Sequence, residues 1–171
     1  YYTNYDGIVE NQVFLVKRNG VRQLLLMPET KEFDLSLKIL YTAHAYVEQN
    51  KTYAWGICFG YSRNKRAGYQ LVLAYTDSEH KMDVTLFSVA GRHKQKIEEQ
   101  TISDISLSSE QLHGMTMELE KSKLTVCISD KCVCFDVEPE KGLIALSKED
   151  GLSPVGFSDL MICGAEEQKE K

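Results

Sequence analysis

The sequence predicts an all-β protein, in which two antiparallel sheets with about a dozen strands pack as a sandwich with minimal helix. Short segments rich in β-branched and aromatic residues recur along the chain, and turn signals separate them at nearly regular spacing. Only one short segment carries helix-capping signals. An open sheet of this size would leave one face unburied, so two packed layers are expected.

The composition bounds the class of protein. The chain has 171 residues, 43% of them hydrophobic, and a formal net charge of −5. Domains cluster at roughly 100–150 residues, so one domain is expected over residues 1–165, followed by a charged tail or linker at 166–171. The acidic balance argues against nucleic acid as a partner, and no apolar run reaches the ~20 residues that cross a bilayer. The start at Tyr1 predicts a mature product or a piece of a larger chain.

The first expected element is a hairpin over Val13–Met27. Asn19-Gly20 supplies the two residues that a type I′ turn favours, between flanking apolar runs. A two-residue turn there would pair Phe14 with Leu25.

Two further strands are expected from residues alternating with period two. Residues 33–39 alternate apolar and polar. In Tyr53–Tyr61 the bulky residues share one face, whereas Ala54, Gly56, Cys58 and Gly60 share the other. A strand with one nearly bare face often lets something approach its backbone closely.

An antiparallel meander is expected next. Strands at Gly68–Tyr75 and Val84–Val89 follow the polar turn 62–67, and the next turn lies at 91–94. Residues 108–114 have capping-box spacing and predict one or two turns of helix. The remaining expected strands are 115–120, 124–128, 133–137, 142–146 and 156–162.

The five cysteines, an odd number, do not suggest a secreted disulfide framework. A turn centred on Asp130-Lys131 would place Cys127 opposite Cys134, with Cys127, Cys132 and Cys134 on the face away from the core. Cβ atoms of cross-strand neighbours lie ~4.5–5.5 Å apart, wider than the ~3.8 Å of a relaxed disulfide. We therefore expect free thiols, with a Cys127–Cys134 bridge as the alternative.

The order of these strands resembles the concanavalin A-like lectin and glucanase superfamily, in its laminin-G-like or bacterial jelly-roll form. The resemblance covers about residues 8–163 and implies a jelly-roll β-sandwich. It is carried by residues 33–37, Trp55–Tyr61, 68–71, 124–126, 132–134, 141–146 and 156–162. It supports the fold far better than the function.

Catalytic and metal sites are weakly indicated. Retaining glucanases of this superfamily place paired carboxylates on one strand face, ~5–5.5 Å apart. Glu118 and Glu120 share a face, but no third acid completes the set, and a solvated strand face is the favoured interpretation. No cofactor is expected. The acidic loop residues Asp77, Glu79 and Asp83 could supply oxygen ligands to Ca²⁺, although their spacing matches no known calcium loop.

Cationic and aromatic residues predict a ligand-binding end. In a meander alternate turns lie at the same end of the sheet, so turns 62–67 and 91–94 should be neighbours. Trp55 is expected in the core, whereas Tyr61 and Tyr69 flank a polar turn and are expected to be exposed. The predicted ligand-binding residues are Tyr61, Arg63, Arg66, Tyr69, Arg92 and His93, with Lys65 and Lys94 adding charge. Asp77, Glu79 and Asp83 should lie at the opposite end.

These observations predict a non-catalytic binding or interaction module. Carbohydrate is the expected ligand class, with an acidic glycan as the narrower expectation. The alternatives are a glycoside hydrolase with unrecognised acids and a protein-interaction domain of a larger chain. The resemblance implies an extracellular or periplasmic location, whereas the odd number of cysteines argues weakly against one.

Overall fold

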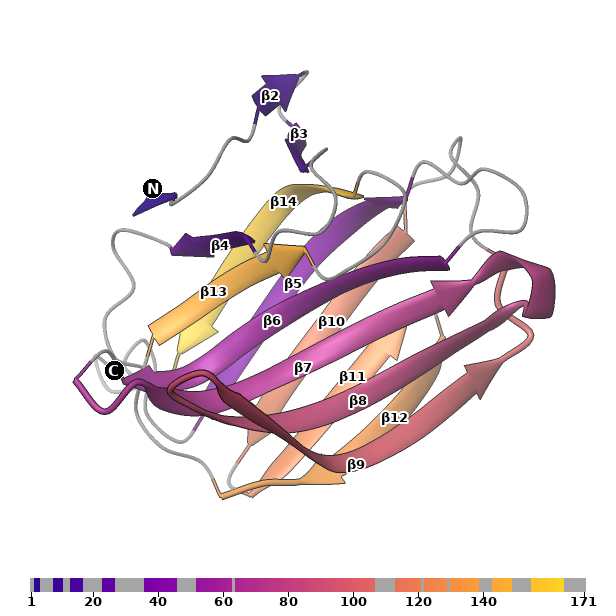
Figure 1. Cartoon of the computed structure of the whole chain (residues 1–171). Helices are drawn as coiled ribbons and strands as arrows, with labels where there is room; N and C mark the ends of the chain where they lie inside the picture. Colours follow the sequence, from indigo (N-terminus) through magenta and orange to yellow (C-terminus); the bar gives the residue numbers. More distant parts are fainter. Residues whose placement is uncertain are drawn as a thin grey trace, which may run out of the picture.

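The computed structural model is a sandwich of two seven-stranded sheets, one in front of the other in Figure 1. It describes backbone and side chains for residues 54–62, 64–106, 115–120, 122–128 and 130–138, and the backbone of the remaining strand residues. Sheet A has the order β1 (Tyr2–Thr3), β4 (Gln23–Leu26), β13 (Leu143–Lys148), β6 (Thr52–Ser62), β7 (Ala67–Thr76), β8 (Lys81–Ala90), β9 (His93–Ser103). Sheet B has the order β12 (Lys131–Asp136), β11 (Lys123–Ile128), β10 (His113–Glu120), β5 (Ser36–Ala45), β14 (Val155–Gly164), β3 (Val13–Val16), β2 (Ile8–Glu10).

The predicted fold class is confirmed. Within the described part of the chain all strand pairs are antiparallel, and the one helical element is the 3-10 turn η1 at Asp77–Glu79. The expected meander is present as β6, β7, β8 and β9, which are consecutive in the chain and adjacent in sheet A. The helix expected at 108–114 falls mostly outside the described residues, and its last two positions belong to β10. The tail 166–171 also lies outside them.

The core confirms the alternation of β6. Trp55 and Ile57 are fully buried and Phe59 almost so, and β7 and β8 bury the matching faces of their strands. Sheet B supplies the opposing layer. The main core residues are Trp55, Ile57, Phe59, Leu71, Leu73, Tyr75, Met82, Val84 and Leu86 from sheet A, and Met115, Met117, Leu119, Leu124, Val126, Ile128 and Phe135 from sheet B.

The hairpin expected at Val13–Met27 is wrong. β3 pairs with β14 and β2 in sheet B, whereas β4 pairs with β13 and β1 in sheet A. The two strands therefore belong to different layers, and residues 17–22, including Asn19-Gly20, lie outside the described residues. Each strand has two neighbours already, so pairing with distant strands overrides the local turn preference.

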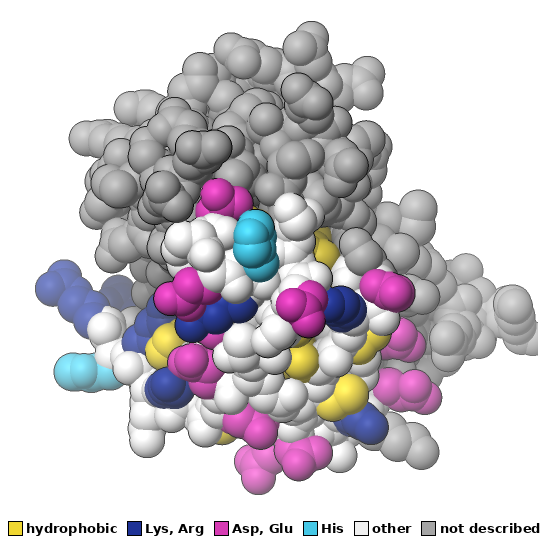
Figure 2. Space-filling model, turned by 90° about the vertical axis from the view of Figure 1, so that its right-hand side faces the viewer, with side chains coloured by type: hydrophobic (Ala, Val, Ile, Leu, Met, Phe, Trp, Pro, Cys, Tyr) yellow, Lys and Arg dark blue, Asp and Glu magenta, His cyan; other side chains and the backbone are white. Residues whose placement is uncertain are grey.

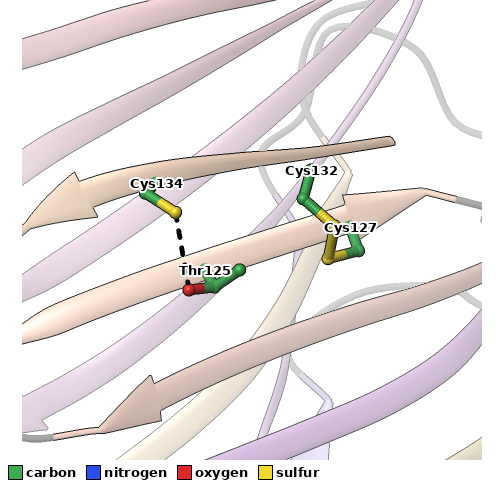
Figure 3. The surroundings of a disulfide bond; sticks show 4 residues. All are labelled: Thr125, Cys127, Cys132 and Cys134. Atoms are coloured by element: carbon green, nitrogen blue, oxygen red, sulfur yellow. Dashed lines mark hydrogen bonds between the residues drawn. A yellow bond between two sulfur atoms is a disulfide. The ribbon is translucent and has the colours of Figure 1, made fainter. Parts of the chain in front are cut away.

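The pairing expected for the cysteines is also wrong. Ile128 pairs with Lys131, so residues 129 and 130 connect the strands and Cys127 faces Cys132, with a Cα–Cα distance of 4.1 Å. These two cysteines form a disulfide and Cys134 is a free, exposed thiol (Figure 3). The predicted faces are nevertheless correct, because Leu124, Val126 and Phe135 are buried while Cys132 and Cys134 are exposed.

A close backbone approach occurs between the neighbouring strands β6 and β7, which is a different contact from the approach over the bare face of β6 that the sequence predicts. A Cβ built on Gly68 of β7 would lie 2.7 Å from the Tyr61 Cα atom and 3.0 Å from the Gly60 carbonyl oxygen. The β6–β7 register shifts between Phe59 and Ser62, and Gly60 has a φ of 58° there. A bulge therefore brings the β6 backbone against β7 at a place that only glycine fits.

Gly68→Ala should destabilise the fold, because the new methyl group collides with backbone that cannot rotate away. We expect a loss of about 1–3 kcal/mol in the free energy of unfolding, measured by urea denaturation. Gly91→Asn is the matched control, since a Cβ there meets nothing within 4 Å and Asn tolerates its φ of 61°. Equal stability of Gly68→Ala and wild type would contradict the close approach.

Tryptic mapping checks the cysteine pairing. Cleavage after Lys123, Lys131 and Lys141 separates Cys127 from the other two thiols, because residues 124–131 and 132–141 become different peptides. The Cys127–Cys132 bond should keep the two peptides joined until a reductant is added. Two separate, alkylated peptides from the unreduced protein would show that the thiols are free.

Candidate functional site

Two turns of the meander form what we call the cationic end, defined by Lys65, Arg66, Arg92, His93 and Lys94. The Gly91 amide donates a hydrogen bond of 2.7 Å to the Arg66 carbonyl oxygen, which joins the β6–β7 turn to the β8–β9 turn. All five defining side chains are exposed. The structure therefore confirms that the two turns are neighbours, as the meander predicts.

The backbone of the β6–β7 turn has a defined local cause. The Lys65 amide donates to the Ser62 Oγ atom at 3.3 Å, and Arg66 has a φ of 52°. A non-glycine residue in the left-handed region is uncommon, and the hydrogen bond from Gly91 holds its carbonyl group in this orientation. Arg63 lies outside the described residues.

The two tyrosines of the predicted site are only half-buried rather than exposed. Tyr69 stacks on Phe59 with ring centroids 5.4 Å apart and packs against the core. Its hydroxyl oxygen accepts a 3.3 Å hydrogen bond from the Glu138 amide. Tyr69 thus attaches the chain after β12 to sheet A. These contacts explain the position of Tyr69 by a structural role, with no ligand required. Tyr61 lies within the β6 bulge, between Phe59 and Ser62.

Phe87 is a neighbour of the cationic end that the sequence analysis missed. The Lys94 ammonium group lies 4.2 Å from the centroid of the half-buried Phe87 ring, a cation–π contact. Val84 and Leu86 face the core, so the alternation of β8 could have placed Phe87 on the outer face. Lys94 therefore carries the positive charge of the turn onto the outer face of sheet A.

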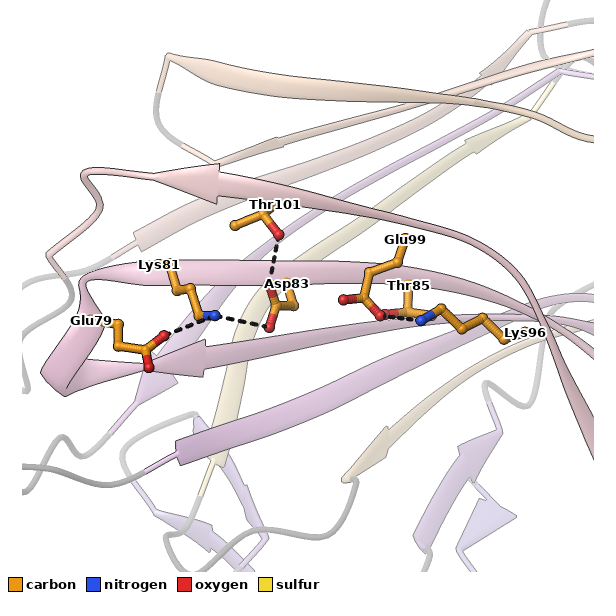
Figure 4. Close-up of polar contacts among 7 residues, drawn as sticks. All are labelled: Glu79, Lys81, Asp83, Thr85, Lys96, Glu99 and Thr101. Carbon is orange, nitrogen blue, oxygen red and sulfur yellow. Dashed lines mark hydrogen bonds and ion pairs between the residues drawn. The ribbon is translucent and has the colours of Figure 1, made fainter.

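At the opposite end, the acidic residues considered for Ca²⁺ have other partners (Figure 4). The Lys81 ammonium group lies 2.8 Å from Glu79 and 4.0 Å from Asp83, and the Thr101 hydroxyl donates to Asp83 at 2.7 Å. The hydrogen bond to Glu79, followed by the charge of Asp83, raises the pKa of Lys81. A lysine between two of the three acids disfavours a second cation. No group of three or more potential metal ligands occurs among the described residues.

A second polar cluster lies on the same face of sheet A (Figure 4). Lys96 pairs with Glu99 at 2.7 Å, and the Thr85 hydroxyl donates to Glu99 at 3.3 Å. The hydrogen bond from Lys96 is the main cause that lowers the pKa of Glu99, against a smaller opposing effect of burial. Thr85 is buried, and its hydrogen bond to Glu99 joins the neighbouring strands β8 and β9.

Charges of both signs are interspersed over the described side chains in Figure 2, which shows one face of the molecule. Such mixing confines any strong positive field to places where basic residues meet without acids between them. The cationic end is such a place, because its turn residues include no acid from Asn64 to Ala67 or from Gly91 to Lys96.

The carboxylates considered for catalysis lie on the outer face of sheet B. Glu118 and Glu120 are exposed and line a hollow of about 440 Å³ with Ser122, Lys123 and Thr125. Lys123 pairs directly with Glu120 across the strands. An exposed acid opposite a lysine lacks the apolar pocket in which a general acid catalyst is typically held. This arrangement agrees with a solvated strand face.

Comparison with solved structures identifies the fold. The carbohydrate-binding module CBM66 from Bacillus subtilis superposes with a TM-score of 0.69 at 11% identity, over 93% of this chain and 91% of that one. A legume lectin-like domain from Entamoeba histolytica gives a TM-score of 0.69 at 11% identity, over 95% and 89%. The alginate lyase A1-II′ gives 0.59 at 8%, over 92% and 82%.

The chain therefore shares the two-sheet jelly-roll fold of these structures, as its strand order predicts. No protein-family model matches the sequence, and no curated protein sequence matches it. These likenesses concern the fold alone, since one fold can host both binding modules and enzymes. Among the described residues, no helix is long and apolar enough to span a membrane.

The Lys96–Glu99 pair generates a pH-dependent prediction. Because the folded-state pKa of Glu99 is lowered, its contribution to stability is present above the unfolded-state pKa and is lost as pH falls through the folded pKa. Lys96→Met should raise the pKa of Glu99 towards its ordinary range, as measured by NMR titration of the carboxyl carbon. Lys123→Met, on sheet B, should leave that titration unchanged. Identical Glu99 curves in wild type and Lys96→Met would refute the assignment.

Proposed function

We propose that this chain is a non-catalytic carbohydrate-binding module and that the cationic end binds acidic glycans. The observation that carries the proposal is the hydrogen bond from the Gly91 amide to the Arg66 carbonyl, which brings two basic turns together. The guanidinium and ammonium groups of the cationic end lie on short turns between long strands. The backbone therefore has little conformational freedom left to lose on binding.

The chemistry of the cationic end suits carboxylates and sulfates. Guanidinium groups such as those of Arg66 and Arg92 offer paired donors that match these planar or tetrahedral anions. Lys94 adds a third positive charge next to the Phe87 ring, whose apolar edge can border a sugar ring. A local basic cluster attracts an anion even though the whole chain has a net charge of −5.

The fold is compatible with this proposal without specifying it. Two of the superposed structures are named as a carbohydrate-binding module and a lectin-like domain, and a third as a lyase. The absence of an acid pair in an apolar setting around Glu118 and Glu120 favours the binding role over hydrolysis. The Cys127–Cys132 disulfide is typical of an oxidising compartment, which supports an extracellular or periplasmic location as part of the same proposal.

Binding to heparin and to oligouronates in low salt tests the proposal. The double variant Arg66→Asn/Arg92→Gln removes both guanidinium groups, and Asn tolerates the positive φ of position 66. Two exposed ionic contacts contribute roughly 0.5–1 kcal/mol each, so affinity should fall about tenfold. The wild-type affinity should also decrease with salt, because exposed charges are screened over ~8–10 Å. Isothermal titration calorimetry measures both effects.

The control variant Lys81→Gln/Lys123→Gln removes the same total charge away from the cationic end, and it should bind as the wild type does. Equal losses in both double variants would reduce the effect to net charge. If no acidic glycan binds in low salt, the cationic end is only a solvated rim. Release of reducing ends from any bound oligosaccharide would overturn the non-catalytic assignment.

A further inference from the structure

One side of the sandwich is closed by contacts between the edge strands of the two sheets. β9 ends sheet A and β12 ends sheet B, and the two strands lie close together at the lower edge in Figure 1. The Lys131 ammonium group donates to the Ser103 carbonyl oxygen at 2.7 Å and to the Asp104 carbonyl oxygen at 3.0 Å. Further along, the Gln100 side-chain amide donates to the Cys134 carbonyl oxygen. We call the contact of Lys131 with Ser103 and Asp104 the lysine latch.

The lysine latch holds the backbone at the point where β9 ends and strand pairing stops. Asp104 has a φ of 57°, in the left-handed region, directly after β9 ends. The next amide, of Ile105, donates to the His80 carbonyl oxygen at 3.0 Å, and the Ile105 side chain is buried in the core. Lys131 therefore fixes the turn that inserts Ile105 under the edge of the sandwich.

The Cys127–Cys132 disulfide lies next to this latch in the chain. Cys132 follows Lys131, and Ile128 and Lys131 form the last pair of the β11–β12 ladder. The disulfide crosses the hairpin one pair further in, so it limits twisting of the end that carries Lys131 (Figure 3). β12 has only β11 as a ladder partner, so backbone pairing holds this end of β12 from one side only.

The disulfide is open to reagents in solution. Cys132 is exposed and Cys127 is half-buried on the outer face of sheet B. Thr125 and the free Cys134 thiol, 3.7 Å apart, lie beside it on the same face. Thiol–disulfide exchange requires that a thiolate reaches one of the two sulfur atoms. The exposed position of Cys132 leaves its sulfur atom accessible to such a thiolate.

We propose that the Cys127–Cys132 disulfide and the lysine latch form a redox-sensitive device that closes this side of the sandwich. A thiolate from a small monothiol attacks the Cys132 sulfur, the S–S bond breaks, and Cys127 leaves as a thiolate that takes up a proton. A second monothiol attacks the resulting mixed disulfide and releases Cys132 as a thiol. The two monothiols are oxidised to one disulfide, and the protein disulfide is reduced to two thiols.

Reduction frees the end of the β11–β12 hairpin to twist, and the Lys131 ammonium group then loses its fixed position under Ser103 and Asp104. Because Asp104 is in the left-handed region, its conformation depends on such surrounding contacts. The turn after β9 opens while the rest of sheet A stays folded, which is local unfolding of a low-stability unit. The cationic end lies at the other end of β9 and is unaffected.

Amide hydrogen exchange with NMR detection tests this device in the intact chain. The Ile105 amide reports on the latch, and the Gly91 amide, bonded to Arg66 at the far end, reports on the remainder of sheet A. Reduction with excess glutathione should accelerate exchange at Ile105 about tenfold and leave Gly91 unchanged, as expected for local opening. Lys131→Met should give the same acceleration with the disulfide intact.

The combination of both changes separates coupling from independent effects. Reducing Lys131→Met should add nothing further at Ile105, because the latch is already absent. Cys132→Ser reproduces the reduced state without any reagent. Unchanged Ile105 exchange after verified reduction would overturn the device, as would additive effects of reduction and Lys131→Met. Equal acceleration at Gly91 would also overturn it, since reduction would then weaken the whole sandwich.

Discussion

The structure depends on the burial of one face of each sheet against the other. Trp55 and Tyr75 have no exposed surface, and they lose all solvent contact only because sheet B covers them. Neither sheet could keep its apolar face in water, since each buried aliphatic or aromatic side chain contributes roughly 1.5–3 kcal/mol through its removal from solvent. The placing of every turn, edge and polar cluster follows from this two-layer requirement.

The two-layer packing determines where chemistry can occur. The inner faces are filled by side chains, so functional groups are confined to outer faces, turns and edges. Consecutive long strands bring the turns before β7 and before β9 to one end, and the amide of Gly91 fixes their spacing. At the other end Lys81 joins Glu79 and Asp83 into one network. The two ends therefore differ in charge because consecutive strands place alternate turns at opposite ends of sheet A.

The sequence predicts those parts of the fold that depend on local patterns. Alternation identified β6, β7 and β8 and the inward position of Trp55, because parity along a strand is a local property. The partner of β3 could not be predicted, since it is determined by distant strands.

The cysteine pair shows the boundary between the two cases: moving the turn by one residue moves each partner by two. The faces were therefore correct although Cys127 was paired with the wrong cysteine. For the candidate site, the adjacency of two turns was predictable, and the inward side of Tyr69 follows from the parity that it shares with Leu71 and Leu73. Its hydrogen bond with the Glu138 amide was not predictable, because that residue lies far away in the sequence.

The charge pattern of β9 also affects behaviour in concentrated solution. Its exposed residues from His93 to Glu99 include Lys94, Lys96, Glu98 and Glu99, with Ile97 as the one large apolar side chain, 48% exposed. An edge strand with unpaired backbone groups can pair with a strand of another molecule and so promote aggregation. Charged side chains oppose this pairing, because their ammonium and carboxylate groups would lose contact with water. The charged residues of β9 therefore oppose edge-to-edge association of the sandwich in concentrated solution.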